Sequence, residues 1–233
     1  MIAIKNGKVV TVTDKTFEHG TVLIEDGKIL AVGENIEIPS DAQVIDASGC
    51  WVTPGLIDCH THISNFNEPS TNPSIPLDGN EMSSPITLQV RAMDAVNPHD
   101  YAISKVRDAG FTTVCILPGS ANVIGGTGIV IKLRDAQTAE EMILPGTEQM
   151  KFAMGENPKR CYGTDRKYPM TRMGLASLMR ETLFKAKVYS DRLKAAELDP
   201  SKAQNQTSSS RHWFLLFVVR CAAASMRTAR TIS

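Results

Sequence analysis

Two histidines, His60 and His62, stand one residue apart at the end of the apolar segment P-G-L-I-D-C-H-T-H. In an extended chain, side chains two residues apart point to the same side, so both imidazoles are expected to face the same way. Neutral imidazole nitrogens bind divalent cations, zinc above all. The pair therefore predicts a shared metal site at the end of a strand. An isolated H-x-H pair is more often an exposed strand end, so the surrounding sequence decides between these interpretations.

Residues 1–52 read as short strands separated by tight turns. The expected strands are rich in β-branched residues, and the N-G, D-G and S-G pairs between them supply the glycines that hairpin turns favour. The strands are expected at 2–4, 8–12, 21–25, 28–33 and 43–46. This segment is predicted to be a small antiparallel β unit.

After Trp51, apolar strands that end in polar loops alternate with helical patterns, which is typical of βα units on a parallel sheet. Strands are expected at 52–58, 111–117, 129–133 and 150–154, and helices at 98–109 and 171–197. The strand at 129–133 could instead be an excursion from a barrel. Because barrel enzymes keep their sites at the carboxyl ends of the strands, the two histidines fall where a site is expected.

A third metal ligand is expected at the exit of the strand in M-K-F-A-M-G-E-N, which runs from Met150. Glu156 follows the glycine that ends this strand and is the predicted ligand. Lys151 and Lys159 are the alternatives, and Lys151 would have to face the barrel interior. Glu156 could equally cap a helix or lie in a loop.

Two polar stretches suggest a substrate pocket, D-G-N-E-M at 78–82 and L-P-G-S-A-N-V-I-G-G-T-G at 117–128. The second follows an expected strand, so its exposed amides could line the pocket, although a glycine-rich loop can also be only a tight crossover. It lacks the lysine of a phosphate-binding loop. The candidate pocket residues are Asn80, Glu81, Ser120 and Asn122.

A β-rich segment over residues 1–52 followed by P-G-L-I-D-x-H-x-H resembles the amidohydrolase superfamily. The two polar stretches resemble its imidazolonepropionase-like members. The resemblance implies an α/β fold, with a small β-sandwich portion at 1–52 and part of a (β/α)8 TIM-like metal-dependent hydrolase barrel at 53–198. Since such a barrel needs about 250 residues, a truncated one is expected. Its open strand edge would favour homo-oligomers or aggregation.

The resemblance also implies a chemistry. A divalent metal, most often zinc, would be held by His60 and His62 together with a carboxylate or a carboxylated lysine from a middle strand. Water activated by the metal would attack a non-peptide C–N bond, such as that of a cyclic amide. The proton-shuttle aspartate and two further histidines come from later strands in this superfamily and are not found in the sequence, so no catalytic residue is assigned.

Two other interpretations stay open. A truncated fragment or a binding module would keep the fold without catalysis, which the missing ligands favour. An enzyme like the N-acetyl sugar phosphate deacetylases would also use a glutamate ligand, here Glu156, but no clear phosphate clamp is visible.

Composition argues against a nucleic acid or a membrane as a partner and leaves a small-molecule substrate. Lys and Arg total 25 and so do Asp and Glu, so there is no basic excess for a nucleic acid. The longest strongly apolar run, 213–219, is far shorter than the roughly 20 residues that cross a bilayer, so no membrane partner is expected. Five cysteines without a C-x-x-C pair, and an N-terminus without a secretion signal, predict a cytoplasmic protein.

Residues 199–233 are predicted to be a linker followed by an out-of-frame or disordered tail. The stretch 199–211 is rich in Ser, Gln, Asn, Thr and Lys, which bury too little apolar area to offset the entropy of ordering. With suitable synonymous codons, a neighbouring reading frame over 226–233 encodes H-A-H-R-A-D-D-I. That string resembles a later metal-ligand strand of the superfamily, which is the basis for expecting a frameshift.

Overall fold

The computed structural model describes residues 1–13, 15–66, 68 and 78–199. The predicted tail, apart from its first residue, lies outside these residues. The chain divides into two compact units, Met1–Leu56 and Ile57–Ser233, which are taken separately below. The sequence predicts this boundary four residues earlier, after residue 52. No helix in the described ranges combines the length and apolar character needed to cross a bilayer.

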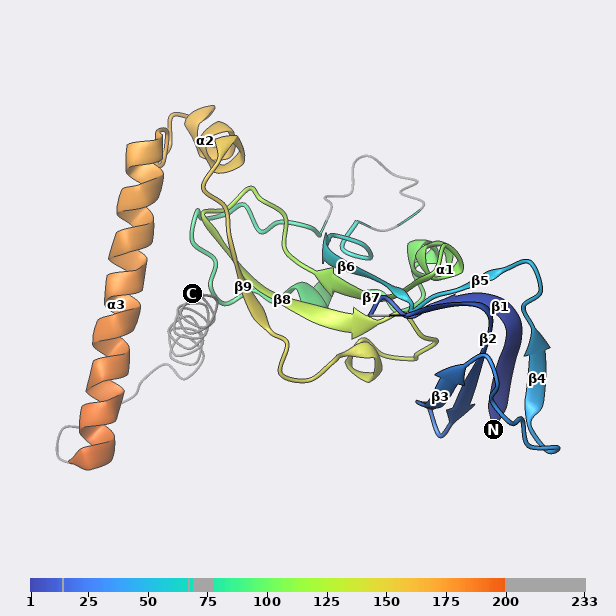
Figure 1. Cartoon of the computed structure of the whole chain (residues 1–233). Helices are drawn as coiled ribbons and strands as arrows, with labels where there is room; N and C mark the ends of the chain where they lie inside the picture. Colours follow the sequence, from blue (N-terminus) through green and yellow to red (C-terminus); the bar gives the residue numbers. More distant parts are fainter. Residues whose placement is uncertain (14, 67, 69–77, 200–233) are drawn as a thin grey trace. The chain divides into compact units, whose positions relative to one another are not determined.

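The first unit is a five-stranded sheet built around β1 (Ile2–Val10) (Figure 1). The strand order is β3 (Lys28–Gly33), β2 (Thr16–Glu25), β1 and β4 (Gln43–Asp46), with β5 (Trp51–Val52) also paired to β1. The β1–β2 and β2–β3 pairs are antiparallel, whereas β4 and β5 run parallel to β1. The prediction of a purely antiparallel unit is therefore wrong. The segment 34–42 is long enough to carry the chain across the sheet and return it in the direction of β1.

Two of the three turn signals in this unit, the D-G and N-G pairs, have different outcomes. Asp26 and Gly27 have φ angles of 49° and 71°, as a tight hairpin between β2 and β3 requires, which confirms the D-G turn. The N-G pair does not turn the chain, because Asn6 (φ 66°) and Gly7 lie inside β1 at a shift of register against β2. A Cβ on Gly7 would lie 2.7 Å from Val52 Cγ2, so glycine lets β5 approach at the bulge.

The second unit contains a four-stranded sheet, β6–β7–β8–β9, in sequence order. Its strands are β6 (Leu56–Thr61), β7 (Phe111–Ile116), β8 (Ile124–Lys132) and β9 (Gln149–Phe152). The β7–β8 and β8–β9 pairs are antiparallel, which corrects the expectation of a parallel sheet. The connection 117–123 is too short for the crossover of a dozen or more residues that parallel strands need. The fold is α/β, with a sheet that forms only part of the expected barrel.

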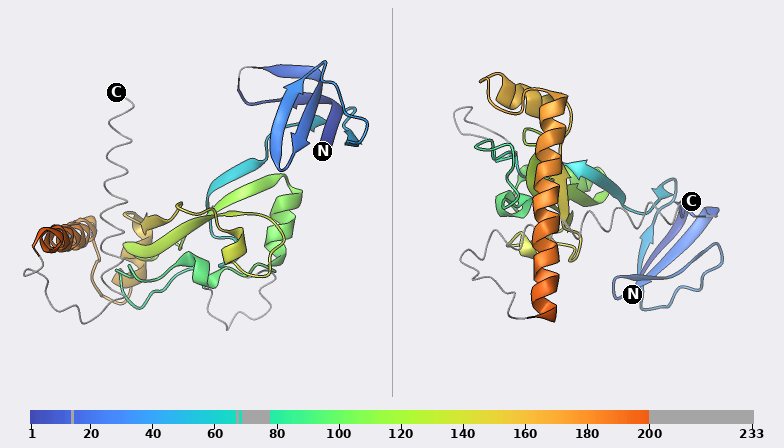
Figure 2. Two further views of the ribbon diagram at one scale, coloured as in Figure 1. Left: turned by 90° about the horizontal axis from the view of Figure 1, so that it is seen from below. Right: turned by 90° about the vertical axis from the view of Figure 1, so that its left-hand side faces the viewer.

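Helix ends follow local capping chemistry. In α1 (Tyr101–Asp108) the Asp100 carboxylate accepts the Ala102 N–H at 2.8 Å, and Gly110 (φ 93°) ends the helix directly after the predicted range of 98–109. Thr171 caps α3 (Arg172–Leu198), which Figure 2 shows as one unbroken helix and which confirms the predicted helix at 171–197. The sequence did not predict α2 (Glu156–Gly163). Two short 3-10 turns lie at Ala92–Ala95 and Glu140–Met142.

The core of the second unit lies on the face of β7 and β8 that packs against α1. Val114 and Ile116 of β7 and Ile103 of α1 belong to one buried cluster, which also contains Ile131 and Met142. A smaller cluster joins the start of β8 to the first turns of α3. Because β6 pairs with β7, this packing also fixes the strand that carries the two histidines.

The Ile116→Ala substitution tests this core. Ile116 is fully buried, so we expect the free energy of unfolding to fall by about 2–5 kcal/mol, as for other large-to-small core changes. Urea unfolding followed by circular dichroism gives the value. Ile57→Ala is the control, since Ile57 is 70% exposed and should cost little. Equal losses for both variants would contradict the proposed core.

Candidate metal centre

Strand β6 brings His60 and His62 side by side. His60 lies one residue before the end of the strand and His62 one residue beyond it. The Asp58 carboxylate accepts the His60 backbone N–H at 2.9 Å and so holds the chain locally. The two ring centroids are 5.4 Å apart with the planes at 82°. His60 is exposed and His62 is half-buried.

The backbone of Leu117 fixes the ring of His62. Its carbonyl oxygen lies 2.7 Å from His62 Nδ1, and its N–H donates to the Thr61 carbonyl at 3.0 Å. A carbonyl can only accept, so Nδ1 carries the hydrogen and Nε2 keeps the lone pair in the neutral ring. Metal-binding histidines are typically oriented by such a bond from their other nitrogen. The arrangement leaves His62 Nε2 as the donor atom for a cation.

Lys151 of β9 approaches His60 from the other end of the sheet. Its Nζ lies 3.0 Å from His60 Nε2, and the residue is only 6% exposed. Burial lowers the pKa of Lys151. The pKa of His60 is lowered by burial first and then by the charge of Lys151. Both shifts favour the neutral forms, whose lone pairs can bind a metal.

No family model matches the chain, but individual proteins do. The solved structure of an amidohydrolase from Thermotoga maritima MSB8 is 38% identical with a TM-score of 0.84, over 94% of this chain and 56% of that one. Amidohydrolase tasK of Hapsidospora irregularis is 38% identical over 168 residues, which are 66% of this chain and 17% of the relative. The chain belongs to the amidohydrolase superfamily.

A third relative is the D-hydantoinase of Geobacillus stearothermophilus. It is 53% identical over 60 residues, which are 26% of this chain and 12% of the relative. The chain spans about half the length of the solved relative. Its matches cover less than a fifth of the two curated relatives.

Glu156, the predicted third ligand, does not join the histidines. Its side chain is 79% exposed, and Oε1 lies 2.7 Å from Lys159 Nζ. Among the residues that the structure describes, no three His, Cys, Asp or Glu side chains are placed to hold one metal ion. The reason is local: α2 begins at Glu156, where a carboxylate is favoured by the helix dipole. Lys151, the alternative to Glu156, is the residue beside His60.

Of the four predicted pocket residues, Asn80 and Asn122 link separate loops. Asn122 is fully buried, and Asn80 donates to its side-chain oxygen at 2.9 Å. The exposed Glu81 carboxylate accepts the Ser83 N–H at 3.0 Å. Ser120 is partly exposed in the same loop. These contacts give Asn122 a structural position, while a substrate role for the other three stays a prediction.

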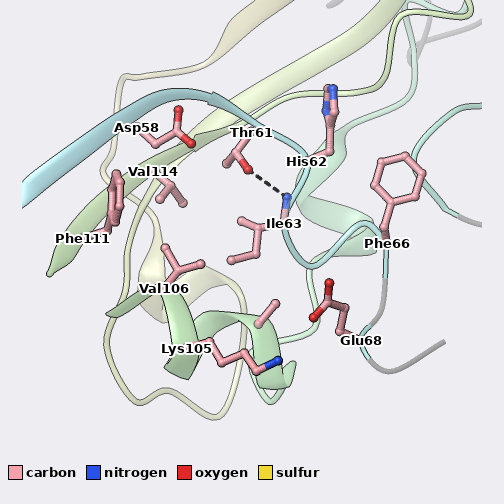
Figure 3. Close-up of a pocket in the computed structure, with 11 residues that line it drawn as sticks. Asp58, Thr61, His62, Ile63, Phe66, Glu68, Lys105, Val106, Phe111 and Val114 are labelled. Atoms are coloured by element: carbon pink, nitrogen blue, oxygen red, sulfur yellow. Dashed lines mark hydrogen bonds between the residues drawn. The ribbon is translucent and has the colours of Figure 1, made fainter. Parts of the chain in front are cut away.

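A hollow of about 450 Å³ lies beside His62, between β6, β7 and α1 (Figure 3). Figure 3 shows the apolar side chains of Ile63, Val106 and Val114 in its middle and His62 at its edge. The Thr61 hydroxyl accepts the Ile63 N–H at 3.3 Å and shapes the turn after β6. The hollow therefore adjoins His62 on the side of α1.

Sequence reasoning missed one contributor to this candidate site, the Leu117 carbonyl, and ranked another, Lys151, behind Glu156. The Leu117 carbonyl leaves no trace in the residue types, because any residue has a backbone oxygen. Lys151 does leave a signal: a lysine inside an otherwise apolar strand is rarely buried unless a neighbour uses it. By that criterion Lys151 is a better candidate for the third ligand than Glu156.

The Lys151→Met substitution tests the coupling to His60. Methionine keeps a similar volume but removes the charge, so we expect the pKa of His60 to rise relative to that in the unsubstituted chain. NMR titration of the His60 ring protons in metal-free protein measures it. Lys159→Met is the matched control, because Lys159 pairs with the exposed Glu156. An unchanged His60 pKa in the Lys151 variant would argue against the contact.

Proposed function

We propose that this chain supplies the first ligands of a metal-dependent amidohydrolase that acts on a small molecule by hydrolysing a non-peptide C–N bond, such as that of a cyclic amide. The observation that carries the proposal is the 3.0 Å approach of Lys151 Nζ to His60 Nε2, beside a second histidine with an oriented ring. The local identity to a D-hydantoinase supports a cyclic amide as the substrate.

The residues present fit a divalent metal, and zinc best. His60 and His62 offer imidazole nitrogens, which zinc accepts readily. Lys151 would act as a carboxylated side chain: its neutral amine forms an N–C bond with carbon dioxide and releases one proton, which leaves a carbamate. Its burial on β9 favours the neutral amine that this step needs. The three side chains would then present nitrogen and oxygen ligands from two strands.

A divalent metal bound here would supply Lewis-acid chemistry, lowering the pKa of water and polarising a carbonyl. The chain's own groups set the geometry. The Leu117 carbonyl holds His62 in one tautomer, and the Asp58 carboxylate holds the His60 backbone. No aspartate in the described ranges is assigned as the proton shuttle to the leaving nitrogen. We propose that this residue lies outside them and that the described chain is an incomplete form of the enzyme.

The protein is proposed to work in the cytoplasm. Cys50, Cys59, Cys115 and Cys161 are free thiols in the structure, which suits a reducing compartment.

Metal binding tests the ligand set. We expect the 233-residue chain, loaded with Zn²⁺ in bicarbonate buffer, to retain about one metal per chain, since one site is proposed. Substituting His60, His62 or Lys151 by alanine should weaken binding at least about tenfold, since each removes a ligand or its orientation. Mass spectrometry of the metal after gel filtration gives the stoichiometry. The exposed His99→Ala is the control. Equal metal content in all variants would exclude this site.

A hydrolysis assay separates the enzyme from a non-catalytic metal-binding module. Ring opening of hydantoin by a zinc-loaded protein in which this chain is extended to the complete barrel is expected to disappear in Lys151→Ala and to persist in Lys159→Ala, because of these two lysines it is Lys151 that contacts His60. A chain that binds zinc through these ligands but opens no cyclic amide supports the binding module. The glutamate on which a sugar phosphate deacetylase would depend is paired with Lys159 on the surface, so no observation favours that alternative.

A further inference from the structure

A buried amide joins three separate segments of the second unit. The Asn122 side chain is fully buried, and its Nδ2 lies 2.5 Å from the Glu81 carbonyl and 2.9 Å from the Ser84 carbonyl. It also lies 3.3 Å from the hydroxyl of Tyr162 in α2, which donates to the Ser84 carbonyl at 2.8 Å. Burial raises the pKa of Tyr162 to about 12, so the phenol stays a donor. The loop after β7 is thus tied to two neighbours.

The segment at Gly79 and Asn80 is also hydrogen-bonded to the loop after β7. Asn80 donates to Asn122 Oδ1 at 2.9 Å, and the Gly119 N–H donates to the Gly79 carbonyl at 2.7 Å. A Cβ on Gly119 would overlap the Asn80 side-chain oxygen. Glycine at 119 therefore lets the two segments lie against each other. The Gly119–Gly79 hydrogen bond holds the chain two residues from Leu117, and the amide pair of Asn80 and Asn122 holds it five residues from Leu117.

The position of Leu117 is also restrained by β8, which packs against it at Gly128. A Cβ on Gly128 would lie 2.6 Å from the Ile116 carbonyl and would overlap the Leu117 side chain, so β8 rests closely on the end of β7. Pro118, with its fixed φ, connects Leu117 to Gly119. The Leu117 carbonyl, which accepts His62 Nδ1–H, therefore has little freedom.

We propose that Asn122, with Asn80, is a positioning residue for His62. The pair fixes the loop whose Leu117 carbonyl selects the Nδ1–H tautomer and so directs His62 Nε2 to the metal. Only the part of the inference that concerns metal binding rests on the proposed function, because the Leu117 carbonyl selects the His62 tautomer whether or not a metal is bound. Without the Asn122 amide, the Glu81 and Ser84 carbonyls lose a buried donor and the loop can move away from His62.

The ring nitrogens of His62 report on this directly. In metal-free chain labelled with ¹⁵N-histidine, NMR spectra at neutral pH should show His62 in the Nδ1–H tautomer, assigned by its absence in His62→Gln. Asn122→Asp keeps the shape and the oxygen but removes the donors, and it should give mixed tautomers. Asn80→Ala should do the same with less loss of packing, since Asn80 is half-buried. Thr182→Val, which removes a buried side-chain bond in α3, is the control and should leave the spectrum unchanged.

Zinc affinity provides the second measurement. We expect it to fall about 10- to 100-fold in both asparagine variants, as for other residues that orient a metal ligand, and to hold in Thr182→Val. Folded Asn122→Asp and Asn80→Ala chains with an unchanged His62 spectrum would overturn the inference. If Asn122→Asp fails to fold, Asn80→Ala decides. A tautomer change in a chain that never binds zinc would refute the proposed function and leave the positioning role standing.

Discussion

A lysine amine buried beside an imidazole constrains the whole second unit. Such a group is costly to bury unless its neighbours use it. Lys151 reaches His60 only because β6 to β9 form one sheet and β9 pairs with β8 in the register that sets Met150 opposite Thr127. A slip of one residue would turn the side chain to the other face. The core between β7, β8 and α1 therefore serves to hold two short strands at a defined separation.

Local signals in the sequence predicted local structure well. The D-G turn and the ends of the helices predicted at 98–109 and 171–197 depend on residues close together in the chain, so neighbours in sequence suffice to predict them. The turn predicted at the N-G pair does not form. The glycine is needed there because Gly7 lies against Val52, which is distant in sequence. The predicted direction of β8 was wrong because the alternation of side chains along a strand is the same in parallel and antiparallel sheets.

The candidate site shows the same division. The H-x-H pair was visible because the two histidines are one residue apart at the end of β6, and the superfamily could be named from the pair and the preceding segment. The place of Lys151, the proposed third ligand, depends on pairing between β8 and β9, which residue types near Glu156 do not encode. The glycine-rich stretch looked like a pocket lining, yet Asn122 turns inward. The sequence alone does not distinguish a polar loop side chain that faces solvent from one that is buried and hydrogen-bonded to other parts of the chain.

Strand β1 has a consequence for how the first unit comes apart. One edge of β1 pairs with β2, and the opposite edge is shared end to end by β4 and β5. Loss of this single strand would strip hydrogen bonds from three others at once, so partial opening of the sheet has few intermediate forms. Amide protons of β2, β4 and β5 should accordingly exchange with deuterium at one common rate, with the β2–β3 turn fraying ahead of them.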